Sequence, residues 1–198
     1  MGYTFSNTAA TTAAVTNRLV TTTNMKVGAY TVANASAVWG GGFLVTATIS
    51  AVTGNDTAGT LAIVGTNLAG QAQTETITLT DGVGGTGAKI FRTVTSVTGA
   101  GWVINTGNDT IVVGVAAGNI VAGSGGTIGG ILVNNSVAAA IVISDAKGTI
   151  VTVPASQAAG TYYNLGGVDF SGFLKVATTS TNDVTVFHTT TVPVYATA

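Results

Sequence analysis

Three glycines have the spacing of a nucleotide-binding loop. Gly82, Gly84 and Gly87 fit the pattern GxGxxG after an expected strand. Such a loop must open a helix whose N-terminus faces a pyrophosphate, but the sequence that follows, KIFRTVTSV, is β-branched and predicts a strand. A P-loop is excluded too, because Lys89 is followed by neither Ser nor Thr. We interpret the segment as a hairpin connection.

A repeated pentapeptide supplies the next candidate chemistry, calcium binding. TGNDT occurs at residues 53–57 and again at 106–110, and each copy offers one carboxylate, that of Asp56 or Asp109. Calcium takes about six to eight oxygen ligands, with several acidic side chains close together. Asn, Asp and Gly also suit tight turns, so we interpret both copies as turns and expect no metal site.

The remaining candidates for catalysis are a single glutamate and a single histidine. Glu75 shares a strand face with Gln71 and Gln73, which favours a solvated position. A glycosidase would need it paired with an aspartate, and nothing in the sequence selects one. His188 ends the run DVTVFH without an evident nucleophile or orienting partner. We therefore expect a non-enzymatic protein without a cofactor, and keep a hydrolase as the weakest hypothesis.

Ionised side chains are unusually scarce. Asp, Glu, Lys and Arg make up 7% of the 198 residues, against about 25% in ordinary soluble domains. The formal net charge of -1 comes from scattered single residues, so no basic stripe could neutralise nucleic acid. A surface this neutral repels its neighbours little, which favours packing against other protein chains.

Hydropathy and the N-terminal sequence limit the expected location, whereas cysteine content does not. Mean hydropathy is +0.53, yet no run approaches the ~20 apolar residues that a membrane-spanning helix needs. The N-terminal residues lack the basic start and apolar core of a signal peptide, so we expect synthesis in a cytoplasm and no membrane partner. The absence of cysteine excludes disulfides and thiolate chemistry.

The elements that carry these residues are expected to be short strands. Phe43, Val45, Ala47 and Ile49 share one parity between threonines and serines, which predicts a strand with one buried face. Turn residues bound similar runs, and we expect further strands at 60–65, 71–80, 89–97, 102–105, 110–115, 131–134, 138–144, 149–153, 161–165, 173–177 and 183–188. No window shows a helical period.

This pattern predicts an all-β fold of two small β-sandwich or barrel-like domains in tandem, preceded by an extended N-terminal arm. We expect the arm at residues 1–24, the first β-domain at 25–116 and the second at 131–198. The glycine-rich segment 117–130 is interpreted as the linker.

Large apolar side chains are the candidate contacts with other subunits. The arm has few anchors, so it is expected to order on a neighbouring subunit, with a frayed terminus as the alternative. Tyr162 and Tyr163 should point to opposite strand faces, leaving one of them exposed, where a sugar-binding platform is an alternative. The candidate interface residues are Leu19, Val20, Trp39, Trp102, Tyr162 and Tyr163.

Two segments resemble structural proteins of tailed-bacteriophage virions. The run GTNLAGQAQTETITLTDGVGGTGAKIFRTVTSV at 65–97 resembles a Thr-Glu-Thr strand, Gly-rich hairpin and Lys-x-Phe-x-Thr-Val strand of such proteins. ILVNNSVAAAIVISDAKGTIV and the closing NDVTVFH are similar to small β-domains of the same kind of protein. Together these low-specificity patterns extend over about residues 26 to 190.

The resemblance implies a capsid decoration or cement protein, located in the virion and made in the host cytoplasm. Its expected partners are the major capsid protein and further copies of itself, with a trimer favoured. The alternative is a head-fibre, neck or tail appendage protein that binds host-surface glycans. The family supplies no catalytic residues.

Overall fold

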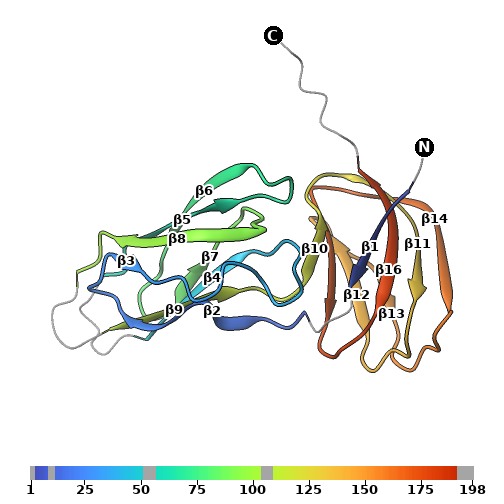
Figure 1. Ribbon diagram of the computed structural model, residues 1–198, viewed down its shortest axis with the longest axis horizontal. Helices are drawn as coiled ribbons and strands as arrows, with labels where there is room; N and C mark the ends of the chain where they lie inside the picture. Colours follow the sequence, from blue (N-terminus) through green and yellow to red (C-terminus); the bar gives the residue numbers. More distant parts are fainter. Residues whose placement is uncertain (1–2, 9–11, 51–56, 104–108, 191–198) are drawn as a thin grey trace, which may run out of the picture. The chain divides into compact units, whose positions relative to one another are not determined.

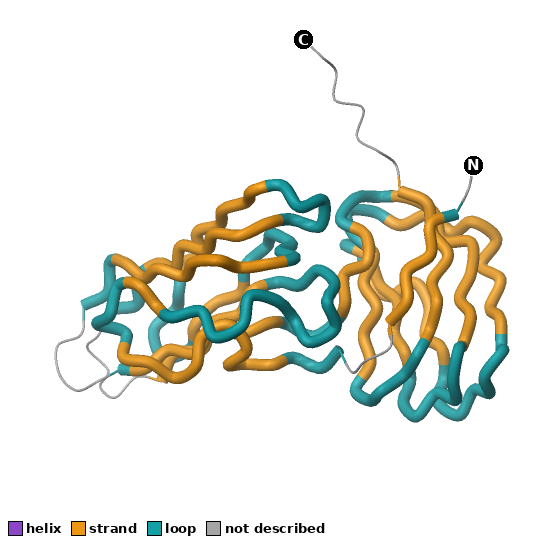
Figure 2. The backbone as a smooth tube through the Cα atoms, in the orientation of Figure 1, coloured by secondary structure: helices purple, strands orange, loops and turns teal. Residues whose placement is uncertain are grey.

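The computed structural model describes residues 3–8, 12–50, 57–103 and 109–190. The regular secondary structure of this part of the chain consists of strands, which Figure 2 shows in orange between teal loops, and they pair antiparallel, so the expected all-β class is confirmed. None of the described segments forms a helix with the length and apolarity that a membrane crossing requires. The strands are β1 Thr4–Thr8, β2 Val15–Asn24, β3 Ala29–Tyr30, β4 Val45–Ser50, β5 Thr60–Thr66, β6 Ala72–Thr78, β7 Gly84–Thr86, β8 Thr93–Ala100, β9 Thr110–Val115, β10 Asn119–Ala122, β11 Gly126–Val133, β12 Ile141–Asp145, β13 Gly148–Val153, β14 Tyr162–Phe170, β15 Leu174–Thr178 and β16 Val184–Thr190.

The chain divides into two compact units, and one is inserted into the other. Unit 1 combines Met1–Ala13 with Gly118–Ala198, and unit 2 is the continuous stretch Ala14–Ala117. β1 belongs with the C-terminal strands, so the two units do not follow the expected order of an arm and two consecutive domains.

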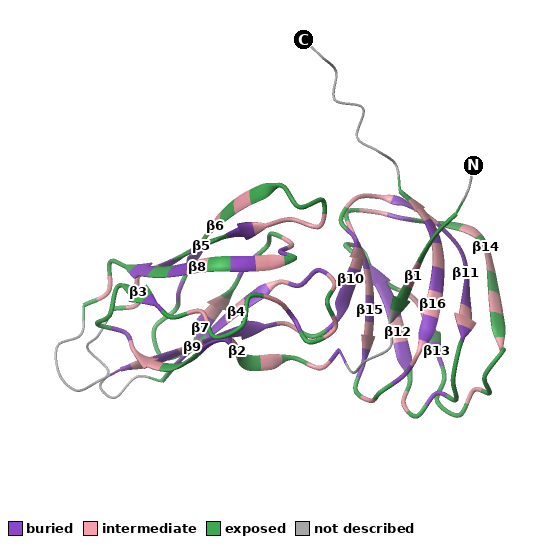
Figure 3. Cartoon of the chain, viewed as in Figure 1, coloured by how far each residue is buried: buried purple, intermediate pink, exposed green. Residues whose placement is uncertain are grey.

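Unit 1 is a sandwich of two four-stranded sheets, ordered β1-β16-β11-β14 and β10-β15-β12-β13 (Figure 1). Alternate residues of both sheets fill its core, and Figure 3 shows the resulting alternation of buried and exposed positions. The largest fully buried side chains here are Ile120, Ile128, Ile131, Ile141, Ile143 and Leu174.

Unit 2 has the same architecture, with sheets ordered β2-β9-β4-β7 and β3-β8-β5-β6. Its separate core contains Phe43, Phe91, Leu61 and Ile63 without measurable exposure. The alternation expected from residue 43 is confirmed, because Phe43, Val45, Ala47 and Ile49 are all buried. Most other expected strands are present. The strand expected at 89–97 begins only at Thr93, as β8. Of the strand expected at 102–105, residues 104 and 105 lie outside the described part of the chain, and Val103 makes an isolated bridge to Thr57.

The expected N-terminal arm is wrong. β1 pairs with β16, with Phe5 opposite Phe187, and β2 pairs with β9. Leu19 and Val20 are 0% and 2% exposed, and register shifts in β2 bring these consecutive residues into the core. Strand pairing satisfies the backbone of this Thr-rich segment, so it needs fewer apolar anchors than composition suggests.

The expected linker at 117–130 is wrong as well, because β10 lies in it and β11 begins in it. Its glycines fit places where a side chain has no room. A Cβ added at Gly126 would lie 2.9 Å from Cζ of Phe170, and similar crowding occurs at Gly129 and Gly130. Gly118 N donates to Thr12 O at 2.7 Å in unit 1, and Val15 pairs with Val115 in unit 2, so the two connecting segments run side by side.

Candidate functional site

The GxGxxG segment forms a turn followed by a strand. The carbonyl of Thr80 accepts hydrogen bonds from the amides of Val83 and Gly84 at 3.1 and 2.8 Å. Gly82 and Gly84 have φ angles of 64° and 114°, a region that favours glycine. β7 then begins at Gly84, so the expected turn is confirmed and no helix N-terminus faces a phosphate here.

Glu75 does not lie on an open solvated face, which corrects that expectation. It stands opposite Ile63 on β5, on the inner side of β6. Its Oε1 accepts hydrogen bonds from the amides of Ala88 and Lys89 at 2.6 and 3.0 Å, and Oε2 is buried. Gln73 supports the same loop by donating to Ile90 O at 2.8 Å. The carboxylate is therefore committed to holding residues 87–90.

His188 is buried in unit 1, with 2% of its surface exposed. Its Nε2 and Ser6 Oγ share a hydrogen bond of 3.0 Å, which ties β16 to β1, while Nδ1 is buried without a partner. Phe170 packs edge-on against the ring at 6.4 Å. Burial lowers the pKa of the imidazole below its usual value. The ring thus joins two strands, and faces no solvent from which it could serve a substrate.

Both carboxylate oxygens of Asp145, a residue that the sequence does not predict to be functional, accept hydrogen bonds. Its Oδ1 accepts from the amides of Lys147 and Gly148 at 2.8 and 3.0 Å, and its Oδ2 accepts from N and Oγ of Ser171 at 2.9 and 3.1 Å. The hydrogen bond from the Ser171 amide is the main cause that lowers the pKa of this carboxyl, with burial opposing it. Asp145 therefore closes the β12–β13 hairpin.

The described residues contain no group of three or more His, Asp and Glu that could hold a metal ion. Most of both TGNDT copies lies outside the described part of the chain. Within it, Asp109 is 1% exposed, and its carbonyl accepts from Met25 N at 3.0 Å.

Four of the six candidate interface residues belong to the core of unit 2 or pack on it. Leu19 and Val20 are buried there and cannot contact another chain in this fold, which corrects their assignment. Trp39 and Trp102 are partly buried against the same core, and Trp102 stacks on Tyr30 at 6.1 Å. Trp39 donates to Gly42 O at 3.4 Å.

The two tyrosines of unit 1 behave as the strand parity predicts. Tyr162 is 53% exposed, whereas Tyr163 is partly buried and packs against the core. Of the six candidates, Tyr162 is therefore the residue with a largely free side chain.

A sheet face whose own strands contribute no ionised side chain covers the outer side of β5, β6 and β8 in unit 2, with the Lys89 ammonium beside it, where Nζ donates to Thr74 O at 2.7 Å. Cross-strand pairing places Ala62 between Thr76 and Thr98, with exposed neighbours on both sides. The only ionised residue within these three strands is Glu75, which points to the inner side. We call this surface the threonine face and define it by the exposed residues Ala62, Val64, Thr74, Thr76, Thr78 and Thr98.

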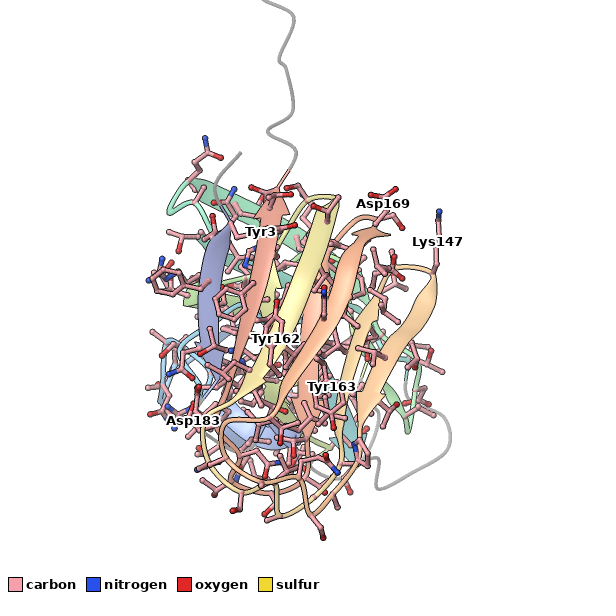
Figure 4. All side chains as sticks on the ribbon, turned by 90° about the vertical axis from the view of Figure 1, so that its right-hand side faces the viewer. Tyr3, Lys147, Tyr162, Tyr163, Asp169 and Asp183 are labelled. Atoms are coloured by element: carbon pink, nitrogen blue, oxygen red, sulfur yellow. The ribbon has the colours of Figure 1, made fainter. Side chains whose placement is uncertain are left out.

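An exposed aromatic cluster covers the outer side of sheet β1-β16-β11-β14 in unit 1 (Figure 4). Tyr3, Phe5 and Tyr162 are 50%, 72% and 53% exposed. Phe187 stands opposite Phe5, and its ring meets that of Tyr162 edge-on at 6.1 Å. We call the surface formed by Tyr3, Phe5, Tyr162 and Phe187 the aromatic face.

The aromatic face could not be recognised from the sequence, because three of its four rings come from segments whose strand pairing the sequence does not predict. The sequence pattern places Tyr3 and Phe5 in the expected arm, and it places Phe187 in a strand without identifying that strand's neighbours. The two-residue spacing of Tyr3 and Phe5 is a signal that could have placed both on one strand face.

No known family matches this chain, and neither the curated proteins nor the solved structures include a significant match to it.

Proposed function

We propose that the protein is a non-enzymatic structural component of a tailed-bacteriophage particle, of the capsid decoration or cement type. The threonine face is the observation that carries this proposal. The resemblance of residues 65–97 and of the C-terminal half to virion structural proteins supports it.

The threonine face suits repeated contact with neighbouring protein chains. Burying Thr, Ala and Val removes apolar and hydroxyl groups from water without the desolvation penalty of an ion. Its low charge, with the Lys89 ammonium as the ionised group next to Thr74, also limits long-range repulsion between copies arranged by symmetry. Many weak contacts of this kind add through avidity, and the partners are the major capsid protein and further copies of the chain, with a trimer favoured.

A charge placed at the centre of the threonine face tests the proposal. Thr76→Lys puts an ammonium group where a neighbour would cover it, and an unpaired buried ion costs several kcal/mol. We expect particle occupancy to fall strongly, as measured by the amount of protein that sediments with particles. Thr152→Lys is the matched control, because Thr152 is also an exposed strand threonine, on β13 of unit 1.

Equal occupancy of the two lysine variants would refute the role of the threonine face. The cement role has its own test, since particles with and without the protein can be compared under pressure or chelator challenge. Equal resistance to rupture would remove that role.

A further inference from the structure

Two glycines hold the tyrosine rings of the aromatic face close to the sheet. A Cβ added at Gly129 would lie 2.7 Å from Cε1 and Cζ of Tyr3, and one at Gly130 would lie 2.6 Å from Cζ of Tyr162. Both rings therefore occupy space that a side chain on β11 would take. Their position is set by packing, which lowers the conformational entropy that a ligand would have to remove.

Tyr3 and Tyr162 are each about half exposed as whole residues. Tyr3 and Tyr162 rest on consecutive residues of β11, and the edge-to-face contact with Phe187 fixes Tyr162 further. The phenol ends of Tyr3 and Tyr162 pack on glycine, and about half of each residue remains exposed, so ring surface is available to stack against the apolar face of a ligand.

The charge on this sheet limits what the ligand can be. β1, β11, β14 and β16 contain one ionised side chain, that of Asp169, and neither Lys nor Arg. A second carboxylate, that of Asp183, directly precedes β16, and Asn134 Nδ2 donates to its Oδ1 at 2.7 Å. Figure 4 shows Asp169 at the upper end of the sheet and Asp183 below Tyr162, so both charges near this face are negative. A polyanion such as nucleic acid or an acidic glycan would find no cation to pair with, so charge complementarity favours a neutral ligand.

Polar side chains next to the rings can orient a ligand that carries hydroxyl groups. Asn164 stands opposite Gly130, and its Oδ1 accepts from Gly166 N at 3.0 Å, which fixes the amide and leaves its Nδ2 donors for a ligand. Asn7 and Thr185 face each other across β1 and β16 below the rings. A few such polar groups beside aromatic surface are typical of a site that binds a small amphipathic ligand.

We propose that the aromatic face binds neutral glycans, whose pyranose C–H faces stack on Tyr3 and Tyr162 while their hydroxyl groups bond to Asn164 and neighbouring side chains. A neutral sugar combines an apolar ring face with a hydroxyl rim and carries no charge, which matches the three properties of this surface. The inference concerns unit 1 and holds wherever on a particle the protein sits.

The test is a glycan array probed with the purified full chain, carrying neutral, sialylated and sulfated oligosaccharides. We expect binding to neutral glycans, weakened about tenfold or more by Tyr162→Ala, since a lost stacking contact of about 1.4 kcal/mol corresponds to tenfold in Kd. Tyr162→Phe keeps the ring and should keep binding. Val168→Ala is the control, because Val168 is exposed on the same strand but lies outside the aromatic face.

Three results would overturn the inference. They are no glycan binding, binding restricted to acidic glycans, and a Tyr162→Ala variant that loses self-association in light scattering but not glycan binding. Tyr3→Ala, at a second exposed site, keeps the test decisive if Tyr162→Ala misfolds. Thr76→Lys should leave glycan binding unchanged, so failure of the particle role and failure of this inference are distinguishable.

Discussion

The substitution Leu19→Ala distinguishes two descriptions of this residue. In one, Leu19 is buried in the core of unit 2; in the other, it belongs to an arm that orders on a neighbouring chain. Leu19 is 0% exposed on β2 and belongs to the same apolar cluster as Val113. Truncating a buried leucine costs about 3 to 5 kcal/mol, as lost transfer free energy plus the remaining cavity. A small domain has only about 5–15 kcal/mol of stability in total, so this one change should remove a large share.

The chain provides a selective probe for this experiment. Its two tryptophans, Trp39 and Trp102, both lie in unit 2, so tryptophan fluorescence reports the unfolding of that unit. We expect urea unfolding of Leu19→Ala, followed by fluorescence, to show the loss of about 3 kcal/mol or more. Val38→Ala is the control, since Val38 is 54% exposed, and its transition should stay within about 0.5 kcal/mol of the wild type.

The opposite pattern would refute the reasoning. If Leu19→Ala unfolds within about 1 kcal/mol of the wild-type protein but loses particle occupancy, residue 19 acts at a contact between chains. The pairing of β2 with β9 would then not describe the isolated protein.

Two further predictions concern His188 and Gly99. His188 is the only histidine, and its pKa is lowered in the folded protein. As the pH falls, the unfolded chain therefore binds a proton at this residue before the folded chain does. The free energy of unfolding of unit 1 should be highest above the usual pKa of 6.5 and should decrease as the pH drops below it. Circular dichroism should show this loss while the fluorescence transition of unit 2 stays constant, and a flat profile for unit 1 would contradict it. Gly99→Ala would place a Cβ 2.6 Å from Cζ3 of Trp102, so the indole must leave its stack on Tyr30, at a cost of about 1–3 kcal/mol. The emission spectrum of the folded variant should change, and an unchanged spectrum would show that the indole does not rest on Gly99.

The strand parities could be predicted from the sequence because they depend on neighbouring residues alone. Alternation places Phe43 and Ile49 inside, and separates Tyr162 from Tyr163, whatever the topology. The all-β class follows from the same local information, together with β-branched residues and frequent turn signals.

The pairing of β1 with β16 could not be predicted in this way. Ser6 and His188 are 182 positions apart, and no local pattern selects such a partner. The prediction of a linker from the glycines of 117–130 was wrong for a related reason. Composition does not reveal whether a Cβ at Gly130 would meet a tyrosine from another strand. The aromatic face depends on the pairing of β1 with β16 and on the glycines of β11. Of its four residues, the sequence alone therefore indicated only Tyr162 as a candidate interface residue.

The insertion of unit 2 between β1 and β10 sets an order of events during synthesis. Unit 2 is continuous and can fold as soon as Ala117 has left the ribosome, whereas β1 must wait for β16. Once unit 2 has folded, the pairing of Val15 with Val115 brings the first and last residues of that unit beside each other. The long segment between β1 and β10 then acts as a short loop. The inserted unit thus lowers the entropic cost of completing the domain that surrounds it in the sequence.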